Sequence, residues 1–149
     1  MEPTFNVFII VNRPRPDVFE AVADPQELSA YFTTGGASAR LEQGQTVMWD
    51  FADFPGAFPV EVTEVVPDEK IVFNWKANEP GTDYQIQVTM KFSEVEPGRT
   101  KVEVAEAGWH TTDAGRKASY GNCMGWAQML AALKMWAEHR INLREGAYK

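Results

Sequence analysis

The middle of the chain alternates between hydrophobic and polar residues with a period of two. Successive side chains of a strand point to opposite faces of a sheet, so this pattern is typical of antiparallel strands with one dry and one wet face. Turn-forming stretches such as Glu96-Pro97-Gly98-Arg99 separate the segments. The alternation predicts strands at residues 47–51, 60–63, 71–76, 84–92 and 101–104.

Another strand is predicted at the start of the chain, over Thr4–Val11. Its residues 5, 7, 9 and 11 are all hydrophobic and share one face. Phe8 and Ile10 make the opposite face hydrophobic as well, which predicts a strand that is covered on both sides.

Two short helices are predicted after this strand. Hydrophobic residues recur at helical spacing over 18–23, just after a proline and an aspartate that favour a helix start. A second start follows at Asp24, where Pro25 suits the first helical position and Glu27 completes a capping box. The glycine pair at 35–36 ends this helix.

The last third of the chain predicts one long helix. Thr112 or Asp113 can cap its start, and Gly146 can end it. At 1.5 Å per residue, the part from 119 to 141 spans about 34 Å, enough to cross a six- or seven-stranded sheet. Gly121 and Gly125 lie inside it, which suggests a kink or a close approach to another segment. Its hydrophobic stripe consists of Trp126, Met129, Leu130, Leu133, Trp136, Ala137 and Ile141.

Composition narrows the class of protein. A chain of 149 residues with 44% hydrophobic residues fits one domain, residues 1–149, with a substantial core. The formal net charge of −7 and the lack of a basic stripe argue against nucleic acid as a partner. No hydrophobic run approaches the roughly 20 residues of a membrane helix, and no signal peptide is evident, so membrane insertion is not expected. Cys123 is the only cysteine, which fits a cytoplasmic location.

Few residues offer catalytic chemistry. His110 and His139 are the only histidines, and no spacing typical of metal ligands is present, so we expect neither a metal nor a cofactor. His110 could act as a general base at the rim of a pocket, but a partly exposed histidine at a strand end is the simpler interpretation. Cys123 lies near the hydrophobic stripe, which favours inert packing. Only Tyr84 and Asp50 join His110 as candidate titratable groups.

Four motifs, in this order, carry a resemblance to a known family. They are Val18-Phe19-Glu20-Ala21-Val22 before Asp24-Pro25, the segment 64–75 that ends in Phe73-Asn74-Trp75, the segment 98–104, and Gly125-Trp126 with Leu130 and Leu133. The chain resembles the helix-grip, START-like (SRPBCC) superfamily, and within it the branch of the activator of heat-shock protein 90 ATPase homologue. The resemblance implies an α+β fold: a curved antiparallel sheet of six or seven strands wrapped around one long C-terminal helix, with two short helices after the first strand.

The resemblance also implies a cavity between the sheet and the long helix. Relatives bind lipids, sterols, polyketides or other apolar molecules there, and aromatic residues fall on the inward faces of the predicted strands. A strand register shifted by one residue would instead turn Asp50, Asn74 and Gln85 inward. The expected cavity lining is Trp49, Phe51, Phe73, Trp75, Tyr84, Ile86, Trp109, Trp126, Met129 and Leu133.

Three functions remain open. The first is binding of an apolar small molecule, of the lipid, sterol or aromatic polyketide class, without catalysis. The second is a regulator or co-chaperone-like module that binds another protein through an exposed patch. The third is an enzyme of the polyketide cyclase type, which would need titratable groups that converge inside the cavity. Either a monomer or a homodimer is compatible with the sequence.

Overall fold

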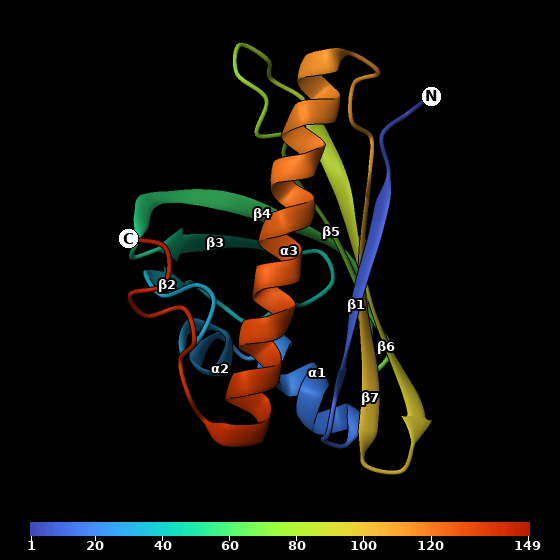
Figure 1. Cartoon of the computed structure of the whole chain (residues 1–149), viewed down its shortest axis with the longest axis vertical. Helices are drawn as coiled ribbons and strands as arrows, with labels where there is room; N and C mark the ends of the chain where they lie inside the picture. The colour runs from blue at the N-terminus through green and yellow to red at the C-terminus, as the bar shows by residue number, and fades with distance from the viewer.

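The computed structural model describes residues 1–149, and its strands form one antiparallel sheet (Figure 1). The strand order is β1-β7-β6-β5-β4-β3-β2, so the first strand along the chain forms one edge. The elements are β1 (Phe5–Val11), α1 (Arg15–Ala23), α2 (Pro25–Ser29), β2 (Gly36–Ala37), β3 (Thr46–Phe51), β4 (Phe54–Val66), β5 (Lys70–Lys76), β6 (Gln85–Glu96), β7 (Arg99–Ala107) and α3 (Asp113–His139).

The long helix α3 lies along one face of the sheet, and α1 and α2 close the lower end of the space between them (Figure 1). A core of 26 buried hydrophobic residues fills this space. Its aromatic centre includes Trp49 of β3, Phe73 of β5 and Trp126 of α3. This arrangement confirms the α+β helix-grip fold, with seven strands.

The predicted caps form at both helix starts, but Glu27 does not complete a capping box, because the Asp24 N–H bonds to the Glu20 carbonyl and the Glu27 carboxylate pairs with Arg140. The Asp24 carboxylate accepts a hydrogen bond from the Gln26 backbone N–H at 2.9 Å, and Pro25 opens α2. The Thr112 hydroxyl accepts one from the Gly115 N–H at 3.0 Å and so caps α3. These side chains satisfy backbone N–H groups that have no partner inside the helix.

The end of α3 differs from the prediction. The helix ends at His139 because Arg140 adopts a left-handed conformation, with φ of 56°, and its N–H bonds to the Trp136 carbonyl. The Arg140 guanidinium also pairs with Glu27 at 2.6 Å, which holds this corner in place. Ile141 consequently lies outside the helix and is exposed, and Gly146 does not end it.

Two further expectations were wrong. Phe8 is 59% exposed, so β1 is covered on only one side; the Lys101 ammonium lies 4.7 Å from the centre of its ring. Gly121 and Gly125 lie in one continuous helix, and a methyl group added at either would meet no atom within 4 Å apart from the neighbouring residues and backbone of the helix itself. They therefore mark open space beside the helix rather than a close contact.

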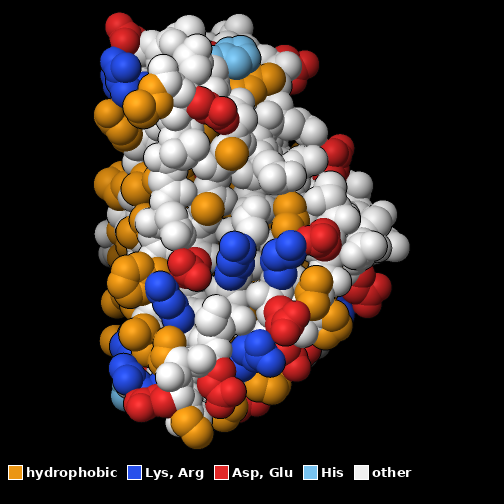
Figure 2. Space-filling model, turned by 90° about the vertical axis from the view of Figure 1, so that its right-hand side faces the viewer, with side chains coloured by type: hydrophobic (Ala, Val, Ile, Leu, Met, Phe, Trp, Pro, Cys, Tyr) orange, Lys and Arg blue, Asp and Glu red, His pale blue; other side chains and the backbone are white.

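The side of the molecule seen in Figure 2 carries Lys and Arg side chains interspersed with Asp and Glu. β1, β6 and β7 lie on this side in Figure 1. Charges of both signs therefore alternate over this part of the surface. None of the helices has the length and hydrophobicity needed to cross a membrane.

Candidate functional site: an aromatic cavity beside α3

The sheet opens between β4 and β5, and this opening creates the main cavity. The ladder between these strands ends at the pair Glu61–Asn74, although β4 begins at Phe54 and β5 continues to Lys76. Pro59 lies just beyond the last pair and has no N–H to donate to a ladder. The first half of β4 therefore pairs with β3 alone and leans away from β5 as a separate hairpin.

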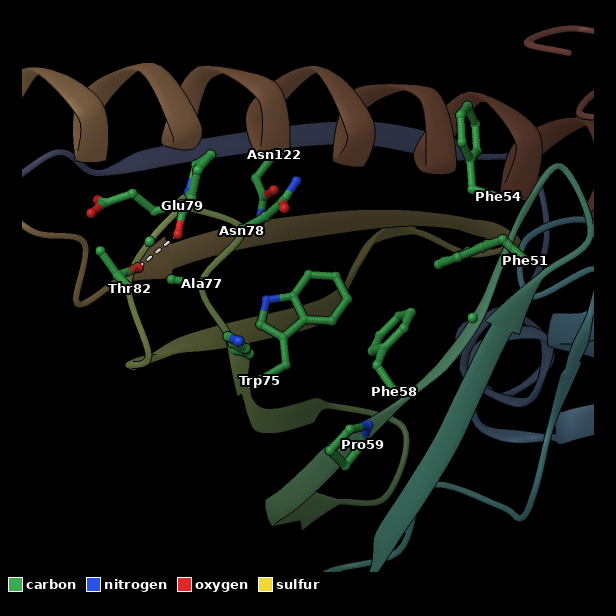
Figure 3. Close-up of a pocket in the computed structure, with 14 residues that line it drawn as sticks. Phe51, Phe54, Phe58, Pro59, Trp75, Ala77, Asn78, Glu79, Thr82 and Asn122 are labelled. Carbon is green, nitrogen blue, oxygen red and sulfur yellow. Dashed lines mark hydrogen bonds between the residues drawn. The ribbon is translucent and has the colours of Figure 1, made fainter.

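A cavity of about 550 Å³ lies in this opening (Figure 3). The β3–β4 hairpin, the end of β5 and the loop between β5 and β6 form its walls, and Asn122 of α3 reaches it from the helix. In Figure 3, the side chains of Phe51, Phe58 and Trp75 face one another across this space. The loop is braced by a hydrogen bond from the Thr82 hydroxyl to the Glu79 carbonyl at 2.7 Å.

The aromatic side chains of the walls pack against one another, one pair stacked and two pairs tilted. The rings of Phe51 and Phe58 are stacked, with centroids 5.7 Å apart and an interplanar angle of 28°. Trp75 lies 5.7 Å from Phe58 and 5.4 Å from Trp126, again measured between ring centroids. Large aromatic faces of this kind bury much hydrophobic surface and suit a flat hydrophobic ligand.

A smaller cavity of about 160 Å³ adjoins the first along α3. The two share Phe51, Trp75 and Asn122 in their walls. Gly121 and Gly125 line the smaller one, where their missing side chains leave the space open. The two helix glycines thus leave room between α3 and the aromatic wall.

Arg144, in the segment after α3, forms another wall of the smaller cavity. Its guanidinium lies 4.8 Å from the centre of the Phe51 ring and 3.1 Å from an oxygen of Asp53. Both charged side chains are largely shielded, with 13% and 15% exposed. This ion pair ties the C-terminal segment to the tip of the β3–β4 hairpin.

A buried carboxylate, Glu106, lies behind the aromatic walls. It follows Val102 and Val104 on the inward face of β7 and is only 2% exposed. Its oxygens accept hydrogen bonds from the indole N–H of Trp126 at 2.6 Å and of Trp109 at 3.2 Å. The Asn122 amide donates to both oxygens, at 3.1 and 3.0 Å.

The surroundings of Glu106 act on its pKa in opposite directions. Burial raises the pKa of this carboxyl above its ordinary value because water no longer stabilises the charge. Hydrogen bonds from Trp126, Asn122 and Trp109 favour the charged form and reduce the shift. Since Glu106 is sealed from the cavity, it cannot contact a ligand directly, and its chemical effect is to orient the three side chains that bond to it.

A second polar cluster lies at the loop end of the cavity. The Tyr84 hydroxyl donates to Glu79 at 2.8 Å and accepts from the His110 backbone N–H at 3.2 Å. The His110 ring stacks on the Tyr84 ring at 3.6 Å and is half exposed. Burial raises the pKa of Tyr84, and its hydrogen bond to Glu79 raises it as well. The hydrogen bond from the His110 N–H lowers it. These contacts fix the loop.

The residues expected to line the cavity fall into three places. Phe51 and Trp75 line both cavities, and Trp126 lines the smaller one. Tyr84, Ile86 and Trp109 form a small cluster beneath the loop end. The remaining four are packed in the main core away from either cavity: Trp49, Phe73, Met129 and Leu133.

Asn74 and Gln85 lie on the outer face of the sheet, as the unshifted register predicts. The Asp50 carboxylate holds the β3–β4 turn by accepting a hydrogen bond from the Gly56 N–H. The sequence analysis missed Glu106 and Asn122. The alternation Val102, Val104, Glu106 would have placed the carboxylate inward, and Asn122 lies one helical turn before Trp126. No group of three or more His, Cys, Asp or Glu side chains is placed to hold a metal ion.

Comparison with known proteins shows the family of this chain and agrees with the fold described above. The family model described as activator of Hsp90 ATPase homolog 1-like protein matches residues 12–138. The fold is similar to that of the protein SSP2350 from Staphylococcus saprophyticus, with a TM-score of 0.81 and 29% identity over 95% of this chain and 96% of that one. No curated protein sequence gives a significant match.

Two more distant structures share the fold. One is the Aha1 dimer from Colwellia psychrerythraea, with 22% identity, a TM-score of 0.74 and coverage of 92% of this chain and 97% of that chain. The other is PFC0360w, an HSP90 activator from Plasmodium falciparum, with 23% identity, a TM-score of 0.68 and coverage of 84% and 88%.

Proposed function

We propose that this chain, which belongs to the family of activator of Hsp90 ATPase homolog 1-like proteins, binds an apolar small molecule in the aromatic cavity that the β3–β4 hairpin, the end of β5 and the β5–β6 loop form beside α3. The observation that carries the proposal is the cavity of about 550 Å³ with its aromatic walls. This volume lies within the range of about 300–1,000 Å³ that is typical of small-molecule sites. Flat, fused-ring compounds such as sterols or aromatic polyketides suit the paired ring faces better than a flexible chain does.

Binding without catalysis fits the groups that line the cavity. Lys76 and Glu79 are its only charged residues, and Glu79 already accepts a hydrogen bond from Tyr84. The one hydroxyl in the walls, that of Thr82, bonds to the Glu79 backbone carbonyl rather than to a side-chain base. The cavity therefore offers surface and orientation to a ligand rather than a set of reacting groups.

The test is a ligand panel of sterols, fatty acids and aromatic polyketides, read by tryptophan fluorescence and by melting temperature. Trp75 forms part of the wall, so a ligand should change its emission, and binding should raise the melting temperature by mass action. A panel that changes neither quantity would refute the proposal.

A matched pair of variants tests the location. Asn78 lines the cavity, is exposed and makes no side-chain hydrogen bond, so Asn78→Trp should fill the entrance without disturbing the fold. Asp83→Trp puts the same indole on the same loop outside the cavity. We expect at least a tenfold loss of affinity in the first variant and unchanged affinity in the second. Equal affinity in both would place the ligand elsewhere.

A protein partner is the second candidate function. The observation that favours it is hydrophobic surface on the solvent side of α3, where Tyr120 and Met124 lie one turn apart and are 65% and 62% exposed. Exposed hydrophobic side chains grouped in this way are typical of interaction surfaces. A Tyr120→Lys, Met124→Lys double variant should then lose the partner, or a self-associated form seen by light scattering, while keeping ligand affinity.

A further inference from the structure

Asn122 is the polar group at which the buried and the open parts of the site meet. It lines both cavities, and its side chain also reaches Glu106 behind the wall. An asparagine amide has one donor end and one acceptor end, and the two make opposite demands on a ligand. Which end faces the cavity therefore decides the chemistry that the cavity recognises.

Glu106 determines this orientation. An ionised carboxylate can only accept hydrogen bonds, and both of its oxygens lie within 3.1 Å of Asn122 Nδ2. The reversed amide would place its oxygen against the carboxylate oxygens, with repulsion in place of two hydrogen bonds. The indole groups of Trp109 and Trp126 cannot help a reversed amide, because they are donors that already bond to Glu106.

The acceptor end of Asn122 is consequently free. Its Oδ1 forms no hydrogen bond within the chain and is not sealed from solvent, unlike the buried unpaired indole nitrogens of Trp49, Trp75 and Trp136. The Trp75 ring lines the same two cavities as Asn122, and Gly121 and Gly125 line the smaller one with it. A ligand that buries this oxygen without bonding to it would lose its hydration with no compensation.

We propose that Asn122 Oδ1 is the polar recognition point of the cavity, and that the ligand is a flat hydrophobic ring system bearing a hydroxyl or N–H donor. This inference rests on the proposed binding function and adds the class of ligand to it. Glu106 acts as a positioning residue, since it touches Asn122 and not the ligand. The aromatic walls supply affinity, and Asn122 selects ligands that can donate a hydrogen bond to its Oδ1.

Two probes of nearly the same shape test the selection: 1-naphthol, which carries a donor, and 1-methylnaphthalene, which carries none. Isothermal titration calorimetry on the full chain gives the ratio of their dissociation constants. A neutral hydrogen bond contributes about 0.5–1.5 kcal/mol, which corresponds to roughly 2- to 13-fold in affinity. Asn122→Leu has a similar volume without the acceptor, so it should shift the ratio by about that factor in favour of 1-methylnaphthalene.

Gln128→Leu is the matched control. Gln128 carries the same amide on the same helix and lines the smaller cavity, but it does not contact Glu106. Its removal makes the smaller cavity more hydrophobic without removing the acceptor that Glu106 orients, so it should shift the ratio less than Asn122→Leu does. The control separates loss of the oriented acceptor from a general gain in hydrophobicity.

A measurement on the unaltered protein covers the case in which Asn122→Leu fails to fold. The side-chain NH₂ signals of Asn122 should move in the nitrogen–proton NMR spectrum when 1-naphthol binds and move much less with 1-methylnaphthalene. If both probes bind with no such difference and the ratio is the same in Asn122→Leu, the inference is overturned while the binding function stands. If neither probe binds although members of the ligand panel do, the inference is overturned; if the panel gives no response either, the binding function fails and the inference falls with it.

Discussion

Replacing Glu106 with leucine tests whether the buried carboxylate organises the wall of the cavity. Leucine has a similar volume, so the change leaves no large void, but the indole N–H groups of Trp109 and Trp126 lose their acceptor. Both tryptophans are only 2% exposed, so water cannot replace the lost bonds. Each buried donor left without a partner costs about 1–3 kcal/mol, or roughly 2–6 kcal/mol for the two.

Two effects reduce this cost. The Asn122 amide can turn toward the cavity and bond to water, so it adds little. The variant also no longer buries a carboxylate, whose raised pKa shows that burial disfavours the charge. We therefore expect Glu106→Leu to lower the free energy of unfolding by about 2–4 kcal/mol.

Urea denaturation followed by circular dichroism measures this change, provided that the slope of the transition stays constant. Glu103→Leu is the control because Glu103 lies on the same strand, faces outward and makes its side-chain polar contacts with Asn6 and Lys101. It should change the free energy of unfolding by less than about 1 kcal/mol. A neutral or stabilising effect of Glu106→Leu would show that desolvation of the carboxylate outweighs its hydrogen bonds, contrary to our reasoning.

Three further substitutions have clear expectations in the same urea assay. Trp126→Ala removes a buried aromatic that packs on Phe32 and Trp75 and should cost about 3–5 kcal/mol; a loss below about 1 kcal/mol would contradict its place in the core. Gly125→Ala should stabilise the protein by up to about 1 kcal/mol, because the added methyl group meets open space in a helix, and a destabilised variant would show that the space is occupied. Met129→Trp should destabilise the protein by about 1–3 kcal/mol, since Met129 is fully packed in the core, whereas an unchanged stability would indicate hidden space around it.

The sequence was sufficient for the fold because each element has a local signal. The alternation over 71–76 and 84–92 marks strands whose inward residues face one another in the sheet, as in the pairs Phe73–Val88 and Trp75–Ile86. The caps at Asp24 and Thr112 likewise depend on neighbouring residues only. The errors arose where tertiary contacts decide, as at Arg140, whose left-handed conformation accompanies an ion pair with Glu27.

The site was less predictable because a cavity is a property of several elements together. Single aromatic residues such as Trp49 and Trp75 have the same pattern in the sequence, yet one is packed in the core and the other lines the cavity. The difference follows from the parting of β4 and β5 at Pro59, which involves the relation between two strands. The inward position of Glu106 could be predicted from the alternation of β7. Its three hydrogen-bond donors could not, because they come from the loop after the strand and from α3.

The proposed role of Glu106 predicts that ligand choice depends on pH. Burial raises the pKa of this carboxyl in the folded chain, so the folded form takes up a proton at a higher pH than the unfolded form does. The stability of the natural chain relative to Glu106→Leu should therefore grow as the pH falls through the interval between the raised pKa and the ordinary glutamate value of about 4.3, and level off below it.

Protonation also changes what Asn122 presents to the cavity. A protonated carboxyl has an O–H that needs an acceptor, and among its bonded neighbours only the Asn122 amide has one, since Trp109 and Trp126 are donors. The amide should then turn and withdraw its oxygen from the cavity. We expect the preference for 1-naphthol over 1-methylnaphthalene to weaken over the pH interval in which the stability difference grows. A preference that stays constant through that interval would show that the carboxylate does not set the orientation of the amide.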